Sequence, residues 1–176
     1  MNQENLWFSV KADEFGGHVI GSIYGNNDNV VNRFISYNAN DLPDIKGKYG
    51  FRVVFRVSSV EGPDAKAAVN SLILNREQVL KLVRHNTSKI EVVVKSEVEG
   101  KNYALKALAI INKTENRYKK AVRKELEENL LDEINKKPLK DLIGEIVTEK
   151  LQHSLQKKLT KIYPTRTVEI RALEPL

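Results

Sequence analysis

The sequence predicts an α+β fold, in which a strand-rich, barrel-like domain is followed by two to three helices and a short C-terminal strand. Apolar and polar residues alternate through much of the first two-thirds of the chain, as at Phe51–Val57, which is the period of a half-buried strand. Apolar residues then recur at helical spacing between 114 and 162, and alternation returns at Val168–Arg171.

The length of 176 residues suits one domain with one core, so we expect a single domain over 1–176. Three segments divide it: mostly strands in 1–112, mostly helices in 113–163, and a returning strand and tail in 164–176. The punctuated strands predict a closed or nearly closed sheet.

Turn-forming residues separate the predicted strands. The clearest hairpin joins Ile90–Val98 to Tyr103–Ile111 through Glu99-Gly100-Lys101-Asn102. The other predicted strands are Leu6–Val10, Val19–Tyr24, Asn32–Asn38, Phe51–Val60 and Ala65–Leu74. The glycine-rich Phe15–Gly21 lacks the spacing of a nucleotide-binding loop, and it predicts a turn or bulge in which a side chain would clash.

Three amphipathic patterns predict the helices. A short helix follows Asn75 as N-cap, and a longer one begins near Thr114 or Glu115. Pro138 ends the longer helix or opens the next, and Pro164 stops the last. We expect the apolar stripes of these helices to lie in the core: Val79, Leu80 and Val83; Tyr118, Ala121, Val122, Leu126, Leu130 and Ile134; then Leu139, Leu142, Ile143, Ile146, Val147, Leu151, Leu155, Leu159 and Ile162.

Several classes of protein are disfavoured. The absence of cysteine excludes disulfides and thiol chemistry, and no apolar run reaches the roughly 20 residues of a membrane span. No secretory leader is recognised at Met1–Asn5, so we expect a cytoplasmic protein. His18, His85 and His153 are far apart in sequence. We therefore expect no catalytic residue, no metal, no cofactor, no membrane association and no small-molecule substrate.

Positive charge is concentrated late in the chain. Residues 1–100 hold 12 Lys/Arg and 12 Asp/Glu, whereas residues 101–124 hold eight and one. Residues 125–149 are acidic, with three Lys/Arg and eight Asp/Glu. Residues 150–171 are basic again, with six Lys/Arg and one Asp/Glu. Segregated charge of this kind is typical of a face that binds a polyanion, although an uneven surface without a partner would have the same composition.

Two basic clusters carry the binding hypothesis. One lies at the start of the helix after Thr114, where the positive end of the helix dipole repels the cations. A bound anion would reduce this repulsion. The other is Lys150, Lys157, Lys158, Lys161, Arg166 and Arg171. Only 12 residues are Phe, Trp or Tyr, so we expect backbone contacts with folded RNA more than stacking on single-stranded bases.

Ordered pieces along the chain resemble the ribosomal protein S-3Ae family. The opening resembles it at Trp7–Ala12, Phe15–Gly17 and Val19–Gly21, and the ending at Lys161–Arg171. Further pieces lie between them: Arg33, Asp41-Leu42, Val83-Arg84, Ser88–Ile90 and Lys119–Lys124. The pieces cover almost the whole chain in family order.

The resemblance implies a non-enzymatic constituent of the small ribosomal subunit, of archaeal type, on the platform near the mRNA exit. Its implied partners are small-subunit rRNA and neighbouring ribosomal proteins, with mRNA near the exit as a further candidate. We expect Trp7 and Phe15 to be core or packing anchors. The expected RNA-binding residues are Lys11, Arg84, Lys89, Lys113, Arg117, Lys119, Lys120, Arg123, Lys124, Lys157, Lys158, Lys161, Arg166 and Arg171.

The chain departs from the family pattern twice. Met1–Leu6 holds no Lys or Arg where a basic arm is usual, and Arg84-His85-Asn86 replaces an arginine-rich run. These departures keep open a second hypothesis, an RNA-binding regulator acting off the ribosome. A third, a magnesium-dependent nuclease using acidic residues such as Glu127 and Glu128, is weaker because no Asp/Glu set has the spacing of a metal site.

Overall fold

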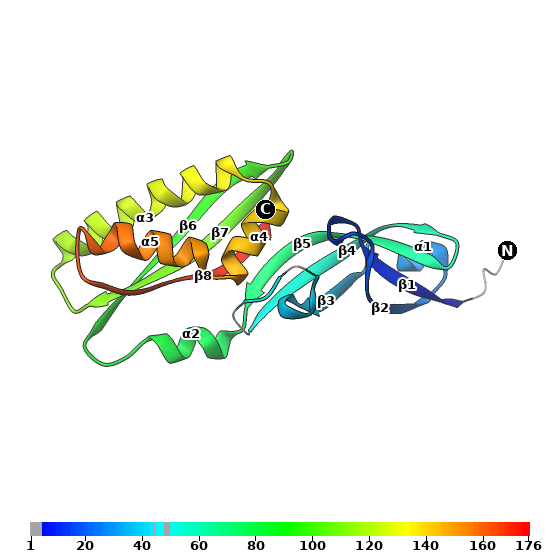
Figure 1. Cartoon of the computed structure of the whole chain (residues 1–176), viewed down its shortest axis with the longest axis horizontal. Helices are drawn as coiled ribbons and strands as arrows, with labels where there is room; N and C mark the ends of the chain where they lie inside the picture. Colours follow the sequence, from blue (N-terminus) through cyan, green and yellow to red (C-terminus); the bar gives the residue numbers. More distant parts are fainter. Residues whose placement is uncertain (1–4, 44, 48–49) are drawn as a thin grey trace.

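The computed structural model describes residues 5–43, 45–47 and 50–176, and it confirms the α+β class. The molecule is elongated, with strands along its whole length and the long helices gathered over one half (Figure 1). The described residues form eight strands in one sheet, in which β5 (Asp64–Leu74) belongs to both halves.

The N-terminal half is a curled group of five strands. β5 pairs with β4 along one edge and with β1, in parallel, along the first part of the other edge, while β2 and β3 flank the group. Its elements are β1 (Leu6–Ala12), η1 (Asp13–Phe15), β2 (His18–Gly25), α1 (Asn27–Val30), β3 (Phe34–Asn38), η2 (Ala39–Asp41), β4 (Phe51–Glu61) and β5.

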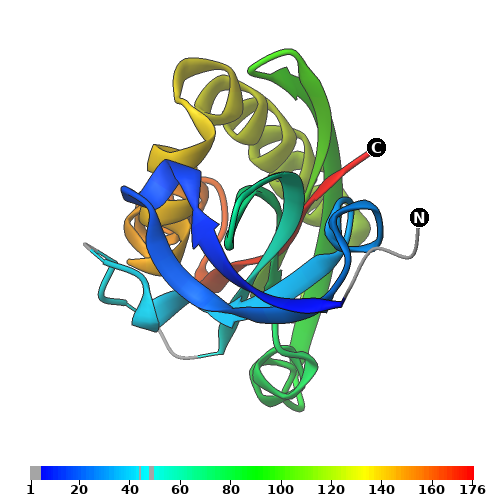
Figure 2. The ribbon, with the colours of Figure 1, turned by 90° about the vertical axis from the view of Figure 1, so that its right-hand side faces the viewer.

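This half curls but does not close into a barrel (Figure 2). In the described chain, β2 and β3 share no ladder; His18 instead meets Tyr37, with 3.4 Å between Nε2 and Oη. We expected a closed or nearly closed sheet, and the closed alternative is wrong. Gly21 lies at this gap, where a Cβ would stand 2.6 Å from Ile35 Cδ1.

The glycine turn after β1 forms as predicted, but for a different reason. Gly16 and Gly17 have φ values of 66° and 76°, a left-handed conformation that glycine adopts without strain. A Cβ at either position would meet no atom within 4 Å. Backbone conformation, not a steric clash, requires glycine there.

The C-terminal half is a three-stranded antiparallel sheet of β6 (Thr87–Val98), β7 (Lys101–Asn112) and β8 (Thr165–Pro175). The predicted β6–β7 hairpin is confirmed, and its turn has left-handed residues at Glu99 and Gly100. β8 pairs with β7 over most of its length and with β5 at Leu72 and Ile73. The last strand thus joins the two halves.

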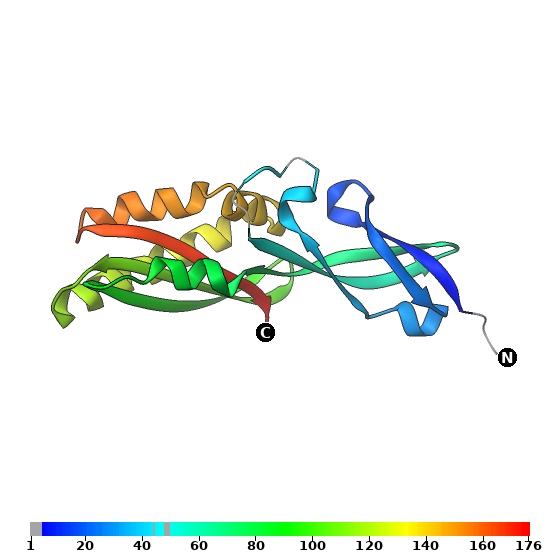
Figure 3. The same ribbon diagram turned by 90° about the horizontal axis from the view of Figure 1, so that it is seen from below.

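Helices lie on both faces of the C-terminal sheet. α3 (Asn116–Lys136), α4 (Leu139–Val147) and α5 (Lys150–Thr160) cover one face, and α2 (Arg76–Leu82) lies on the opposite side (Figures 1 and 3). The predicted stripe of α3 is largely confirmed, since its buried residues are Val122, Leu126, Leu130 and Ile134. Ala121 is exposed, so its assignment to the core was wrong.

The predicted single helix over 139–162 is in fact two helices. Glu149, between α4 and α5, has φ 61°, which turns the chain out of the α-helical path. Leu142, Ile146, Leu151 and Leu155 are nevertheless all buried, so the apolar spacing continues across the break.

Three further residues expected to be core or packing residues are exposed. Leu80 of α2 is 62% exposed and Val83 46%, so the stripe of this short helix is not core; only Val79 packs against it. Trp7 is 67% exposed and contacts Tyr24, whereas Phe15 is buried against Phe55 as expected. Asn75 precedes α2 as predicted, but its side chain makes no capping hydrogen bond.

Candidate nucleic-acid interface

The start of α3 and the end of α5 meet at one end of the molecule. The two helices lie side by side on the sheet, and this end is on the left in Figure 1. The rings of Tyr118 and Tyr163 are 5.0 Å apart, and Tyr163 Oη donates to the Lys113 carbonyl at 3.5 Å. Arg166 Nε donates to Asn112 Oδ1 at 2.7 Å. Residues about 50 positions apart in sequence are thereby held together.

The loop between α2 and β6 reaches the same end. Lys113 N donates to the Asn86 carbonyl at 3.1 Å, and Thr87 pairs with Asn112 in the β6–β7 ladder. Arg84 and His85, just before Asn86, are exposed. Three segments that are separate in sequence therefore contribute to one surface.

We name this surface the terminal basic cluster. Its members are Arg84, Lys113, Arg117, Lys119, Lys120, Arg123, Lys124, Lys157, Lys158, Lys161 and Arg166. All are exposed except Lys119 and Lys158, which are half-buried, and Glu115 is the one acidic residue in 112–124 and 157–166. Like charges are held together here by apolar packing and the tyrosine contact beneath them.

Most of these cations have no carboxylate partner within the described part of the chain. The exceptions are Lys124 with Glu128 at 3.8 Å and Lys158 with Glu133 at 3.8 Å. The Arg117 guanidinium lies 4.9 Å from the centre of the Tyr118 ring. Exposed cations without internal partners are available to an external anion.

The backbone at the start of α3 adds to the attraction for anions. Glu115 is the N-cap, and its side chain makes no capping hydrogen bond. The first turn contains no acidic residue, so the positive end of the helix dipole faces further positive charge. A phosphate bound there would satisfy free N–H groups and neutralise lysines at once.

The acidic middle of α3 ties the helices together. Lys137 Nζ lies 2.7 Å from Glu133 and 2.5 Å from Glu145 of α4, and Lys158 of α5 lies 3.8 Å from Glu133. The hydrogen bond from Lys137 holds the pKa of Glu133 below its usual value, although partial burial acts in the opposite direction. This network fixes α5 relative to α3 and so fixes the cluster.

Three predicted RNA-binding residues lie outside the cluster. Lys11 is on β1 in the N-terminal half and pairs with Asp64 at 2.5 Å. Lys89 and Arg171 lie on the face of the sheet that α2 adjoins, and both bind Glu91, at 3.1 and 2.8 Å. The hydrogen bond from Lys89, followed by that from Arg171, lowers the pKa of Glu91.

The described residues contain no group of three His, Asp or Glu side chains that could hold a metal ion. Glu128 pairs with Lys124, and Glu125 accepts a hydrogen bond from Asn129. Glu125 and Glu128 therefore have structural partners within the helix. In the described part of the chain, no helix is both long and apolar enough to cross a membrane.

Sequence reasoning missed the part played by the tyrosines. Tyr118 was assigned to an apolar stripe, and Tyr163 was noted only within a motif, yet their contact brings the two basic stretches together. The signal available was position, since each tyrosine lies within a few residues of several cations. The contact itself depends on the pairing of β8 with β7, which local patterns do not specify.

The sequence of this chain is similar to those of known proteins. The model of the Ribosomal S3Ae family matches residues 3–176. A protein of Methanothermobacter thermautotrophicus named small ribosomal subunit protein eS1 is 27% identical over 173 residues, covering 96% of this chain and 88% of the relative. The proteins of the same name from Methanopyrus kandleri and Desulfurococcus amylolyticus are 28% and 26% identical, covering 99% and 93% of this chain and 86% and 79% of those relatives.

The family match spans nearly the whole sequence, and the three archaeal relatives align over 79% to 88% of their own length. The match confirms the family expected from the sequence motifs. It is a family of ribosomal proteins and not of enzymes. The chain belongs to the Ribosomal S3Ae family.

Proposed function

We propose that this protein is a structural constituent of the small ribosomal subunit and that it grips folded rRNA through the terminal basic cluster. One observation carries the proposal: two basic stretches far apart in sequence meet at one end of the molecule, joined by Tyr118 and Tyr163. If the uneven distribution of charge were only a matter of composition, the two basic stretches would have no reason to meet. Their meeting gives a continuous surface for phosphates.

The chemistry of the cluster favours backbone contacts. Lysine and arginine side chains neutralise phosphates without reading base identity. The half-buried Tyr118 and Tyr163 rings already contact each other, which leaves little aromatic surface for bases. The target that fits is therefore RNA of fixed shape, such as an rRNA helix, recognised by its spaced phosphates.

The finer assignments rest on the family resemblance. We propose a place on the platform near the mRNA exit, ribosome association in the cytoplasm, and neighbouring small-subunit proteins as further partners. We also propose that residues 1–176 act as one domain, because β8 pairs with strands of both halves. Lys11, Lys89 and Arg171 remain weaker candidates for RNA contact, since each has an internal carboxylate partner.

The test uses two variants with equal loss of charge. The first replaces Lys120, Arg123 and Lys161 of the cluster with alanine; the control replaces the exposed Lys81, Lys95 and Lys101, which lie elsewhere. Binding to small-subunit rRNA is measured over a series of salt concentrations. We expect the cluster variant to lose about two to three units of the log–log salt slope, at roughly 0.7–0.9 per phosphate contact, and the control variant to lose little.

Equal behaviour of the two variants would overturn the assignment to the cluster. Sedimentation separates the remaining hypotheses, because a ribosomal constituent co-sediments with the small subunit. A protein that binds RNA with the expected salt slope yet stays out of that fraction would instead be a regulator acting off the ribosome.

A further inference from the structure

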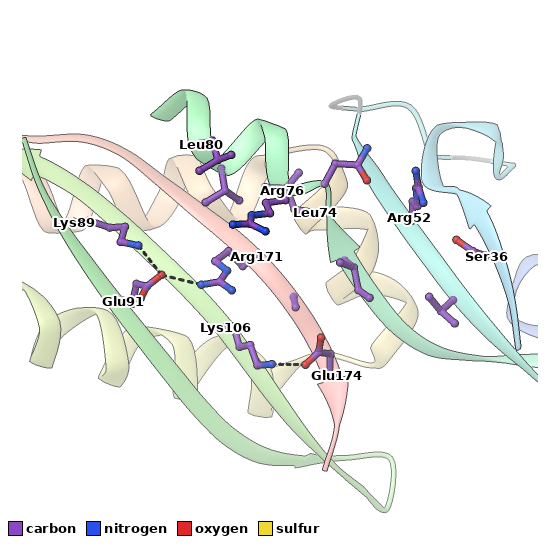
Figure 4. Close-up of a pocket in the computed structure, with 15 residues that line it drawn as sticks. Ser36, Arg52, Leu74, Arg76, Leu80, Lys89, Glu91, Lys106, Arg171 and Glu174 are labelled. Atoms are coloured by element: carbon purple, nitrogen blue, oxygen red, sulfur yellow. Dashed lines mark hydrogen bonds and ion pairs between the residues drawn. The ribbon is translucent and has the colours of Figure 1, made fainter. Parts of the chain in front are cut away.

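A second surface lies on the opposite side of the C-terminal sheet from α3 and α5. It is a groove of about 740 Å³ between α2, the end of β5 and the strands β4, β6, β7 and β8 (Figure 4). Apolar side chains line part of it, notably Ile73 and Leu80, which are 38% and 62% exposed. Because Ile73 and Leu80 line the same groove, they offer a partner a shared apolar surface to cover.

The charged lining of the groove divides into paired and free groups. Lys89 and Arg171 bind Glu91, and Lys106 binds Glu174, as the dashed lines of Figure 4 show. Two further cations line the same groove, Arg52 of β4 and Arg76 of α2. Within the described chain neither has a carboxylate partner, so the groove has an unmet positive charge beside its apolar surface.

RNA fits this lining poorly. Among the described residues that line the groove none is aromatic, so this lining offers bases no ring to stack on. The carboxylates of Glu91 and Glu174 would repel a phosphate backbone, and the exposed aliphatic side chains have no hydrogen-bond donors for phosphate oxygens. A polypeptide with carboxylates and aliphatic side chains would match both the free arginines and the apolar surface.

We propose that this groove docks an acidic segment of another protein. Carboxylates of that segment pair with Arg52 and Arg76, and aliphatic side chains cover Ile73 and Leu80. The Arg171–Glu91–Lys89 arrangement holds the floor of the groove in place. The inference concerns a surface separate from the terminal basic cluster and does not depend on RNA binding.

The test is an NMR titration of the full chain labelled with ¹⁵N. The probes are a short peptide that alternates leucine and glutamate, the same peptide with glutamine at each glutamate, and an oligonucleotide that folds into a short RNA hairpin. We expect the glutamate peptide to shift the amide signals of 73–80 and 171–174, and to bind at least about tenfold more tightly than the glutamine peptide. Equal binding of the two peptides, or no shift of these amides, would overturn the proposal.

The oligonucleotide keeps the two proposals distinguishable. If the oligonucleotide shifts only the amide signals of 113–124 and 157–166, the result supports the assignment of the groove to a protein partner. Shifts in the groove with the oligonucleotide would show an RNA site there and overturn the assignment to protein. The absence of any oligonucleotide effect would count against the terminal basic cluster alone.

Two variants locate the peptide. The double change Arg52→Ala and Arg76→Ala should weaken glutamate-peptide binding by about tenfold or more. Lys120→Ala with Arg123→Ala removes the same charge from the terminal basic cluster and should leave that binding unchanged. Leu80→Ser should weaken the binding of both peptides, because it removes apolar surface and leaves the charge of the groove unchanged. An equal loss in the Lys120/Arg123 control would mean diffuse attraction to net charge and would overturn the proposal.

Discussion

The two halves of the molecule share one sheet but present different surfaces. Residues 1–75 hold seven Lys/Arg and eight Asp/Glu, whereas residues 76–176 hold 22 and 15. Aliphatic side chains are exposed in both halves, but among the described residues the exposed aromatic side chains Trp7, Tyr24 and Phe34 all lie in the N-terminal half. The N-terminal half is a curled group of strands, whereas the C-terminal half is a three-stranded sheet covered by helices, so the halves differ in backbone as well as in surface chemistry. The comparison shows one scaffold bearing two kinds of contact surface.

The largest expected effect tests whether the halves fold together. Phe55→Ala empties a fully buried site in the N-terminal half, and Leu130→Ala does so under α3. Each should lower the free energy of unfolding by about 3–4 kcal/mol. Denaturation is followed by fluorescence of Trp7, the single tryptophan, and by circular dichroism of the helices, of which the three longest lie in the C-terminal half.

Because β8 pairs with both halves, we expect the two signals to give one midpoint in the wild type and in each variant. Separate midpoints, with Phe55→Ala moving only the fluorescence, would mean that the halves unfold independently.

A smaller effect compares the aromatic pairs of the two halves. Tyr163→Ala removes a half-buried ring that packs on Tyr118, and it should cost about 2 kcal/mol of stability. Tyr24→Ala removes a ring that is 51% exposed and packs on Trp7, and it should cost less than about 1 kcal/mol. Thermal unfolding measures both. Similar costs would contradict the view that only the C-terminal pair has a role in holding the fold.

The ion pairs of the helical half predict a pH effect. The pKa of Glu133 is lowered in the folded protein, so its contribution to stability is present above the usual value of 4.5 and is lost as pH falls through the folded value. Glu133→Gln should cost about 1 kcal/mol near pH 7, and the difference from the wild type should shrink as the pH falls below 4.5. Urea denaturation at several pH values measures this.

Glu128→Gln is the matched control, because its pair with Lys124 is more exposed. It should change stability by less than about 0.5 kcal/mol at any pH. A pH-independent cost of Glu133→Gln would instead indicate lost packing.

The smallest effect concerns α2. Leu80→Ser should change the free energy of unfolding by no more than about 0.5 kcal/mol, because the side chain is 62% exposed. Chemical denaturation provides the measurement. A cost near 2 kcal/mol would restore the original expectation that this stripe is core.

Local patterns predicted the elements well where one face is clearly buried. The β6–β7 hairpin and the stripe of α3 follow from alternation and from helical spacing, which depend on neighbours in sequence. The break at Glu149 was missed because its single left-handed residue leaves the apolar spacing intact. The exposure of Trp7 and Leu80 was missed because hydrophobicity alone does not say which face a partner element covers.

The candidate site was predicted only in part. The cations were visible as two charged stretches, but their meeting is a property of topology. α3 and α5 end up side by side because both pack on one face of the same three strands, and β8 returns to complete that sheet. Arg171 was grouped with the second stretch by sequence and Lys89 was predicted to bind RNA separately, whereas the alternation of side chains along β6 and β8 places both on the other face of the sheet.

The position of β8 also bears on how the chain acquires its structure during synthesis. Residues 165–175 follow every other element, yet they form the strand between β7 and the end of β5. A nascent chain that has already made its hairpins and helices must leave this slot open, with apolar edges unprotected, until the final strand emerges. Completion of this sheet is then a long-range step, and a chaperone acting on the growing polypeptide would find exposed surface at that slot.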